Sequence, residues 1–324
     1  MIELEHICKT FRVAKRNAGM GEAVRALFRR EYTLIHALQD ISFQIRDGEM
    51  VGYIGPNGAG KSSTIKIMSG ILNPDSGMCR IDGLIPWKNR RAHVRNIGVV
   101  FGQRSQLWWD VPVIDSFELI RDIYEVEPSA YRQTLDKLVT LLNLSEIIRT
   151  PVRQLSLGQR MRCEIAASLL HNPGILFLDE PTIGLDAVSK IAVRNFIRQL
   201  NREQKTTVIL TTHDMQDIEA LTERILLVGR GQILLDGTLD ELKSRNAPVR
   251  RINVLYAGGY FDLPEGVILT SDENGHAAFT VDTRVCSVSY AIEQLSRHAE
   301  ITDLSVEGAT AEELVVSLYE EFAI

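Results

Sequence analysis

Eight consecutive residues of this 324-residue chain could hold a phosphate chain, because Gly55–Ser62 matches the pattern G-x-x-x-x-G-K-[ST]. The apolar run Met50–Ile54 before it predicts a strand, and Ser63–Met68 after it predicts the start of a helix. Backbone N–H groups of such a loop surround the phosphates, and the helix N-terminus adds partial positive charge. Lys61 would reach the β- and γ-phosphates, and the Ser62 hydroxyl would bind Mg²⁺. A plain glycine-rich turn is the simpler alternative, but it would require neither side chain.

Polar residues end three other segments that predict strands. Gln103 follows Ile97–Phe101, the carboxylates Asp179 and Glu180 follow Ile175–Leu178, and His213 follows Thr207–Thr212. Taken singly, each has a simpler interpretation: a surface glutamine, an acidic pair that caps a turn, a structural histidine. Near-continuous apolar runs that alternate with helical segments are typical of buried parallel strands, and they predict an α/β fold.

The order of these segments, with Leu155–Gln159 opening a helix between them, resembles the ATP-binding-cassette (ABC) ATPases over roughly residues 2–240. The resemblance implies a P-loop NTPase cassette: a RecA-like core, an antiparallel β subdomain and a helical signature subdomain. It implies ATP and Mg²⁺ as cofactors. No internal repeat is visible in the sequence.

The resemblance also implies a role for each polar residue. Asp179 would hold the water shell of Mg²⁺, and Glu180 would act as the general base on the attacking water. His213 would contact the γ-phosphate, and Gln103 would contact Mg²⁺ and the water while linking the site to a membrane partner. The implied metal ligands are Ser62, Gln103 and Asp179. The implied nucleotide contacts are Phe11, Gly55, Pro56, Asn57, Gly58, Ala59, Gly60, Lys61, Ser62, Ser63, Ser156, Gly158, Gln159 and Asp186.

Ser156 and Gly158 resemble the family's signature loop, which caps the γ-phosphate held by another subunit. The usual sequence is L-S-G-G-Q, and here Leu157 replaces the first glycine, which puts only the local loop geometry in doubt. One chain carries one P-loop and one signature, so the resemblance implies a head-to-tail dimer, expected to be a homodimer, with two ATP sites.

An aromatic residue is expected to stack on adenine. Phe11 occupies the matching position, and a strand-end core residue is the alternative. Tyr32 is a rival candidate because about twenty extra residues lie between Phe11 and the segment that begins at Ala37. The insert, about 12–35, is basic over residues 12–30.

Within the insert, four apolar residues share one helical face and predict a short basic amphipathic helix: Met20, Val24, Leu27 and Phe28. This helix would contact anionic lipid or a membrane subunit. Alternatively, its apolar face would pack on the cassette.

Trp108 and Trp109 lie where the family receives a membrane subunit, and they would either anchor that interface or join the core of the helical subdomain. The segment from Phe101 to Met161 resembles bacterial export-type cassettes that work with separate membrane subunits. We therefore expect transmembrane permease subunits as partners.

The character of the chain changes after about Arg245. Strand-like and helical segments there predict a small α+β domain over 246–324, after an ATPase domain over 1–245. A hairpin is expected around Glu273-Asn274-Gly275, and Thr310 with Glu313 forms a capping box that would open a last helix. A stabilising or regulatory appendage is the expected role.

Composition excludes several classes. A net charge of −6 argues against a general nucleic-acid binder, and no apolar run is long enough for a transmembrane helix. The acidic start is no signal peptide, and Cys8, Cys79, Cys163 and Cys286 are spaced for neither a disulfide framework nor a zinc site. We expect a peripheral protein at the cytoplasmic face of the inner membrane, reached through its partner.

The sequence thus predicts the ATP-hydrolysing subunit of a bacterial ABC transporter, most simply an exporter. The ATPase of an importer and a soluble cassette ATPase of cofactor assembly are the alternatives. DNA-repair cassettes carry long coiled coils between the two parts of the site, and the interval from Gln103 to Leu155 leaves no room for them. Translation-type proteins carry two cassettes, and this chain has one.

Overall fold

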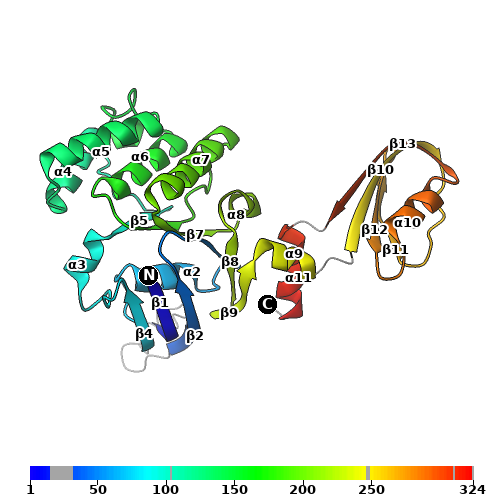
Figure 1. The fold of residues 1–324 in the computed structure, drawn as a ribbon, viewed down its shortest axis with the longest axis horizontal. Helices are drawn as coiled ribbons and strands as arrows, with labels where there is room; N and C mark the ends of the chain where they lie inside the picture. The colour runs from blue at the N-terminus through cyan, green and yellow to red at the C-terminus, as the bar shows by residue number, and fades with distance from the viewer. Residues whose placement is uncertain (15–31, 103, 246–248, 309–310, 323–324) are drawn as a thin grey trace, which may run out of the picture. The chain divides into compact units, whose positions relative to one another are not determined.

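The computed structural model describes residues 1–14, 32–102, 104–245, 249–308 and 311–322 (Figure 1). The chain forms two compact units, Met1–Asp236 and Gly237–Ile324. The domains expected from sequence, 1–245 and 246–324, remain a proposal about which parts fold independently.

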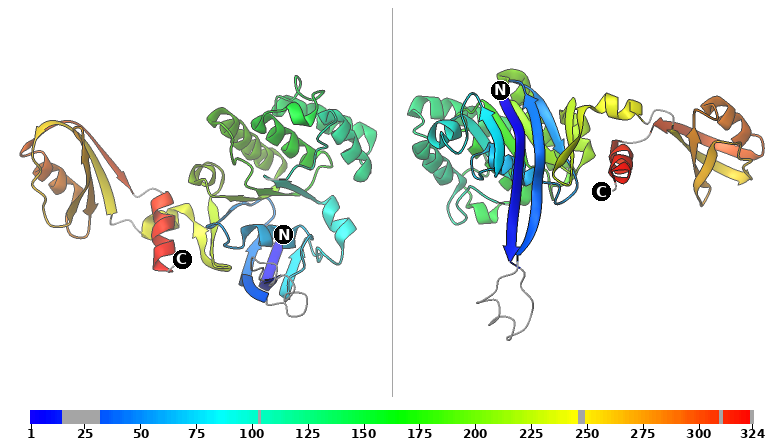
Figure 2. Two further views of the ribbon diagram at one scale, coloured as in Figure 1. Left: turned by 180° about the vertical axis from the view of Figure 1, so that it is seen from behind. Right: turned by 90° about the horizontal axis from the view of Figure 1, so that it is seen from below.

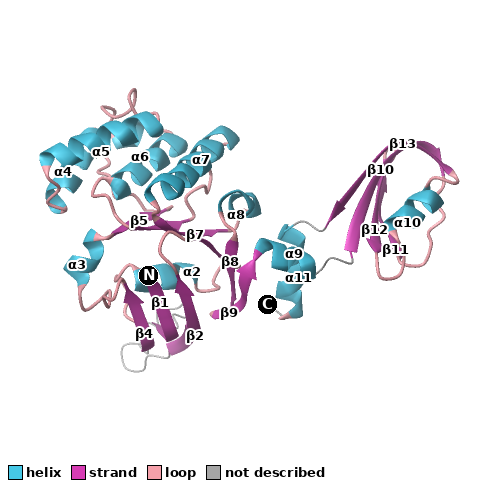
Figure 3. Ribbon diagram, viewed as in Figure 1, coloured by secondary structure: helices cyan, strands magenta, loops and turns pink. Residues whose placement is uncertain are grey.

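A six-stranded sheet in the order β5-β6-β7-β3-β8-β9 forms the centre of the first unit (Figure 3). Its strands are β3 (Met50–Ile54), β5 (Ile97–Phe101), β6 (Ile175–Asp179), β7 (Thr207–Thr212), β8 (Arg224–Gly229) and β9 (Gln232–Thr238). The pairs β5-β6, β6-β7, β7-β3 and β3-β8 are parallel, as the apolar runs predict. Strands β6 and β7 are buried over nearly their whole length, which explains why these runs do not alternate with polar residues.

Helices connect the parallel strands. They are α2 (Lys61–Met68), α3 (Arg90–Arg95), α4 (Val113–Ile123), α5 (Pro128–Leu141), α6 (Leu157–Leu169), α7 (Ala187–Gln204) and α8 (Met215–Leu221), with a 3₁₀ turn at Val152–Gln154. α4 and α5 pack against α6 (Figure 1). Among the described helices, none has the length and apolar composition needed to cross a membrane.

Helices α4 and α5 are separate, with residues 124–127 between them. Pro128 begins α5, where its missing N–H costs nothing, and the Glu127 carboxylate accepts hydrogen bonds from the N–H groups of Ser129 and Ala130. Local capping therefore restarts the helix.

A three-stranded antiparallel sheet in the order β2-β1-β4 forms the other sheet of this unit, from β1 (Ile2–Ala14), β2 (Tyr32–Ile45) and β4 (Ser76–Ile81). β1 and β2 pair as far as Ala14 and Tyr32, as a long ribbon (Figure 2). Both ends of the insert expected at 12–35 are thus strand, because they continue the ladder. The predicted basic helix, with Met20 and Phe28, lies outside the described residues.

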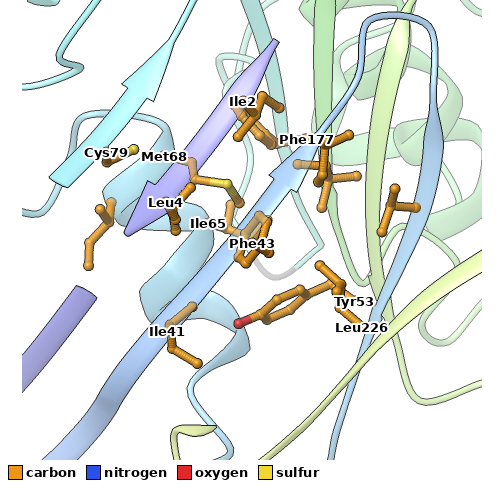
Figure 4. Packing of buried hydrophobic residues seen from close by; sticks show 14 of the residues in the cluster. Ile2, Leu4, Ile41, Phe43, Tyr53, Ile65, Met68, Cys79, Phe177 and Leu226 are labelled. Carbon is orange, nitrogen blue, oxygen red and sulfur yellow. The ribbon is translucent and has the colours of Figure 1, made fainter. Parts of the chain in front are cut away.

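The core of this unit joins the two sheets across α2 (Figure 4). Ile65 and Met68 of α2 contact a cluster that includes Leu4 of β1, Phe43 of β2 and Phe177 of β6. This packing holds the start of α2, and with it the P-loop, against the end of β3.

The second unit contains a four-stranded antiparallel sheet in the order β11-β12-β10-β13. Its elements are α9 (Leu239–Arg245), β10 (Val249–Gly259), β11 (Val267–Glu273), β12 (His276–Asp282), α10 (Val288–Leu295), β13 (Ala299–Gly308) and α11 (Ala311–Glu321). Phe279 of β12 and Leu295 of α10 lie in its core. The predicted hairpin is present, and its turn residues Asn274 and Gly275 both have positive φ. Thr310 lies outside the described residues.

Candidate active site

The carboxyl ends of four neighbouring strands meet at one edge of the central sheet. Ile54 pairs with Thr212, and Asp179 pairs with both Thr211 and Phe101. Residues that directly follow these strands are therefore brought to the same edge, where open α/β sheets bind their ligands. The fold thus unites polar residues that lie far apart in the sequence.

The loop after β3 fits closely against its surroundings. Gly60 has a φ of 106°, and an added Cβ there would lie 2.5 Å from the backbone oxygen of Ala37. At Gly55 an added Cβ would lie 2.4 Å from the backbone oxygen of Val228. A side chain at either position would displace backbone, so these two glycines are required by packing as well as by the phosphate-loop motif.

Lys61 is the buried cation of this loop, with 6% of the residue exposed. Its Nζ donates hydrogen bonds to the backbone oxygens of Gly55 at 2.6 Å and Pro56 at 3.2 Å. Burial lowers the pKa of Lys61, while the charges of Glu180 and Asp179 raise it. A bound anion would offset the cost of burying this charge.

Asp179 connects the loop to the neighbouring strands. Its Oδ1 lies 3.4 Å from Ser62 Oγ and accepts a 2.6 Å hydrogen bond from Thr211 Oγ1. A hydroxyl and a carboxylate side by side suit Mg²⁺, which usually keeps several waters and binds one or two carboxylates plus substrate phosphates. The described residues contain no group of three or more His, Cys, Asp or Glu side chains that could hold a metal. The Ser62 hydroxyl and the Asp179 carboxylate fit a cation held jointly with a phosphate.

Glu180 and His213 form a hydrogen-bonded pair beside the loop. His213 Nδ1 lies 2.7 Å from Glu180 Oε2, with the imidazole side chain 61% exposed and the carboxylate 17% exposed. The contact leaves Nε2 of the histidine available for a ligand. A partly buried carboxylate oriented by an imidazole is suited to polarise a water molecule.

A cleft of about 440 Å³ brings these groups together. Its described lining is Ile35, Ala37, Asn57, Gly58, Gly60, Lys61, Ser62, Ser63, Glu180, Ile183 and His213. Neither Phe11 nor Tyr32 is among these described lining residues. Ile35 is the ladder partner of Phe11, so both side chains lie on one face of the ribbon. The adenine contact of Phe11 remains a prediction.

Other predicted ligand residues occupy helix starts outside this described lining. Ser156 and Gln159 form a capping box at the start of α6, with hydrogen bonds of 3.2 and 2.9 Å. Asp186 caps α7, and hydrogen bonds from Ser189 lower its pKa. An added Cβ on Gly158 would lie 2.4 Å from Ser189 Oγ, so the two helix starts are in contact. Their predicted nucleotide contacts remain a proposal.

Leu157, which replaces the usual glycine, is 37% exposed, and its Cδ2 would lie 2.9 Å from a Cβ on Gly184. It joins the signature loop to the loop before α7. Gln103 lies outside the described residues, so its predicted role stays a prediction.

Sequence reasoning missed four contributors to the site. Thr211 bonds Asp179, and Ile35, Ala37 and Ile183 line the cleft. Thr211 carried a signal, since it lies in the same strand end as His213. Ile35 carried none, because only the ribbon pairing brings it to the loop.

Known proteins resemble this chain in sequence and in fold. The family model described as "ABC transporter" matches residues 38–183. The ABC transporter ATP-binding protein NatA of Bacillus subtilis (strain 168) is 30% identical over 215 residues, covering 66% of this chain and 87% of that protein. The daunorubicin resistance ATP-binding protein DrrA3 of Streptomyces coeruleorubidus is 32% identical over 289 residues, covering 87% of this chain and 90% of that protein.

A solved structure confirms the predicted cassette fold. The dimeric post-hydrolysis state of the ATP-binding cassette MJ0796, bound to ADP and Pi, matches with a TM-score of 0.61 and 26% identity, covering 74% of this chain and 98% of that chain. The chain therefore belongs to the ABC transporter family as one of its ATP-binding proteins, and it is an ATPase.

Proposed function

We propose that this chain energises an ABC exporter from the cytoplasmic face of the inner membrane, as a peripheral subunit bound to separate membrane subunits. The observation that carries the proposal is the Glu180–His213 pair at a cleft formed by the P-loop. The phosphate loop, the proposed base Glu180 and the imidazole of His213 lie together. ATP hydrolysis can therefore be coupled to movement of the elements that hold these groups.

The ATP phosphates would lie along the loop from Gly55 to Ser63. Lys61 would exchange part of its bonding to backbone oxygens for the β- and γ-phosphates. Ser62 and Asp179 would hold Mg²⁺, which, when bound, neutralises charge that develops on the phosphates.

Glu180 would accept the proton of the attacking water. His213 Nδ1 holds the Glu180 carboxylate, and the free edge of the imidazole would contact the γ-phosphate. His213 would thus orient the proposed base Glu180 and also contact the γ-phosphate when it is bound.

A complete site would need a second copy of the cassette. Ser156 and Gly158 are outside the described lining of the cleft in their own chain, whereas the family resemblance assigns them to a γ-phosphate. In a head-to-tail arrangement of two chains, Ser156 and Gly158 of one chain would contact the γ-phosphate bound in the cleft of the other. MJ0796, whose solved structure is dimeric, gives a precedent.

The membrane subunits would dock beside the segment that follows β5. Trp108 and Trp109 are 59% and 52% exposed, which fits an interface anchor better than a core position. A groove of about 360 Å³ that includes Ile71, Arg90 and Arg104 lies in the same region. These apolar and basic groups could receive a short cytoplasmic segment of a permease.

Export is favoured by the relative DrrA3, whose name states daunorubicin resistance. Its alignment, 289 residues long, exceeds the first unit, so the likeness extends into the second unit as well. The second unit would then be part of the exporter subunit, with a stabilising or regulatory role.

The deciding experiment is affinity purification of the full chain, with Glu180→Gln and ATP present, from detergent-solubilised native membranes. We expect co-purification of multi-spanning membrane subunits, identified by mass spectrometry. The control is Lys61→Ala in the same procedure, which should recover less partner because the ATP-bound state does not form.

Recovery of a dimer without any membrane protein would contradict the transport proposal and favour a soluble cassette ATPase of cofactor assembly. Once the membrane subunits are identified, transport assays with them would separate export from import.

A further inference from the structure

We propose that Asp217 is a positioning residue for the Glu180–His213 pair. This carboxylate lies in α8, is fully buried and is absent from the described lining of the cleft. It would act through neighbouring segments rather than by touching ATP. The inference rests on the roles proposed above for Glu180 and His213.

Asp217 accepts hydrogen bonds from three separate elements. Thr182 Oγ1, in the loop after β6, and Thr212 Oγ1, in β7 and 3.3 Å away, both donate to Oδ2. Arg194 Nε of α7 donates to Oδ1. A buried carboxylate needs such donors, and hydrogen bonds to a charged group are stronger than neutral ones. Each segment is therefore held tightly to one side chain.

Two of these donors are directly connected to the catalytic pair through the backbone. Thr182 lies two residues after Glu180, and Thr212 immediately precedes His213. Thr212 Oγ1 also accepts a 3.0 Å hydrogen bond from the N–H of Asp214, so both sides of the histidine are held. A shift of either threonine would change the distance between base and imidazole.

The backbone of Glu180 needs this support. Its φ of 56° lies in the left-handed region, which is unfavourable for a residue with a side chain. Its N–H donates to Thr211 O at 2.9 Å and to Thr211 Oγ1 at 3.2 Å. The Asp217–Thr182 bond anchors the other side of this strained residue.

The third donor ties α7 to the same centre. Arg194 Nη2 forms a salt bridge of 3.6 Å with Asp214 Oδ2, and Lys190 Nζ donates a hydrogen bond to the same oxygen. Helix α7 begins at the Asp186 cap, and its start contacts the signature loop. Asp217 therefore connects the segment around His213 to this helix. One buried carboxylate thus links three segments that the proposed mechanism uses, namely the loop after β6, the end of β7 and helix α7.

Removing single hydroxyls tests the proposal with little change in shape. Thr182→Val and Thr212→Val should each lower kcat about ten-fold or more, since small misplacements of catalytic groups are costly. KM for ATP and the Kd of a non-hydrolysable ATP analogue should stay within about two-fold, because the P-loop contacts are intact. Thr182→Ser and Thr212→Ser retain the hydroxyl and should restore kcat.

A matched control separates positioning from loss of stability. Ile218→Val alters the neighbouring, fully buried residue of α8 and should lower Tm without lowering kcat measured well below Tm. Asp217→Asn, which keeps the shape, should lower kcat at least as much as either valine variant. Wild-type kcat in both valine variants would overturn the proposal, as would equal losses in the valine and serine variants.

These experiments distinguish a failure of the Asp217 proposal from a failure of the roles proposed for Glu180 and His213. If Glu180→Gln retains normal turnover, the assignment of the base is wrong. If Glu180→Gln is inactive while the valine variants keep full kcat, only the positioning role of Asp217 is wrong.

Discussion

Glu180 combines a strained backbone conformation with the proposed role of general base. Its left-handed backbone conformation turns the carboxylate from the end of β6 towards His213, 2.7 Å away. An unfavourable backbone conformation persists only where neighbours enforce it. Thr211 and the Asp217 network supply these neighbours, so the strain is maintained by tertiary contacts.

At this scale we predict that Glu180→Gln lowers steady-state ATPase activity by about 10²–10⁴-fold, the usual contribution of a general base. ATP affinity should be retained, because Gln keeps the size of the side chain and the P-loop is unchanged. Phosphate release and nucleotide titration measure the two effects.

Glu146→Gln, the same chemical change at an exposed position of the first unit, is the control and should be silent. A Glu180→Gln protein that hydrolyses ATP at the normal rate would refute the assignment of the base.

At the scale of elements, α6 is attached to the segment after β5 by a buried acid. Glu164 is 4% exposed and accepts hydrogen bonds from Ser105 Oγ and, at 3.1 Å, from the N–H of Gln106. Gln106 Nε2 also donates to the backbone oxygen of Glu164 at 2.9 Å. Helix α6 is thereby linked to the segment after β5, and Ser105, Gln106 and Glu164 all line the proposed docking groove.

This acid predicts a pH dependence of stability. Burial raises the pKa of Glu164, and the hydrogen bonds from Ser105 and Gln106 only partly oppose it. A carboxyl whose pKa is raised on folding stabilises the fold most at low pH, and the contribution is lost as pH rises through the folded pKa. The window opens near the ordinary glutamate pKa, at about pH 4.3.

Glu164→Gln cannot ionise and should therefore gain stability relative to the native protein as pH rises through this window. Urea unfolding at several pH values, followed by tryptophan fluorescence, measures the difference. Glu146→Gln, at an exposed position, controls for the removal of one acidic group. A difference that is constant with pH would mean that Glu164 titrates normally.

At the scale of the whole molecule, only some of the residues predicted to contact ATP belong to the described lining of one cleft. The P-loop, Glu180 and His213 line the cleft, whereas Ser156 and Asp186 cap helices outside its described lining. ATP would therefore act as the contact between two copies of the chain.

We predict that Glu180→Gln forms a stable dimer only with ATP, because the nucleotide is bound but not hydrolysed. Size-exclusion chromatography with light scattering should show the mass double on addition of ATP and Mg²⁺. The double variant Lys61→Ala/Glu180→Gln should stay monomeric, since it lacks the phosphate-binding cation. A monomer at saturating ATP would contradict the head-to-tail arrangement.

The sequence by itself determined the phosphate loop, the acidic pair and the parallel strands, because each depends on neighbours in the chain. Gly55–Ser62 is contiguous, and Asp179 and Glu180 directly follow an apolar run. Local patterns also predicted the β11–β12 hairpin.

Only the tertiary structure decided how the site is held together. Thr182 and Asp217 meet across 35 positions, and Ile35 reaches the cleft only through the β1–β2 ribbon. Such contacts cannot be predicted from the periodicity or composition of the sequence, because nothing in the local sequence shows that Asp217 is buried or that Thr182 is its partner. The residues that could carry the chemistry thus lie in short segments of the chain. Their positions relative to one another depend on long-range packing contacts.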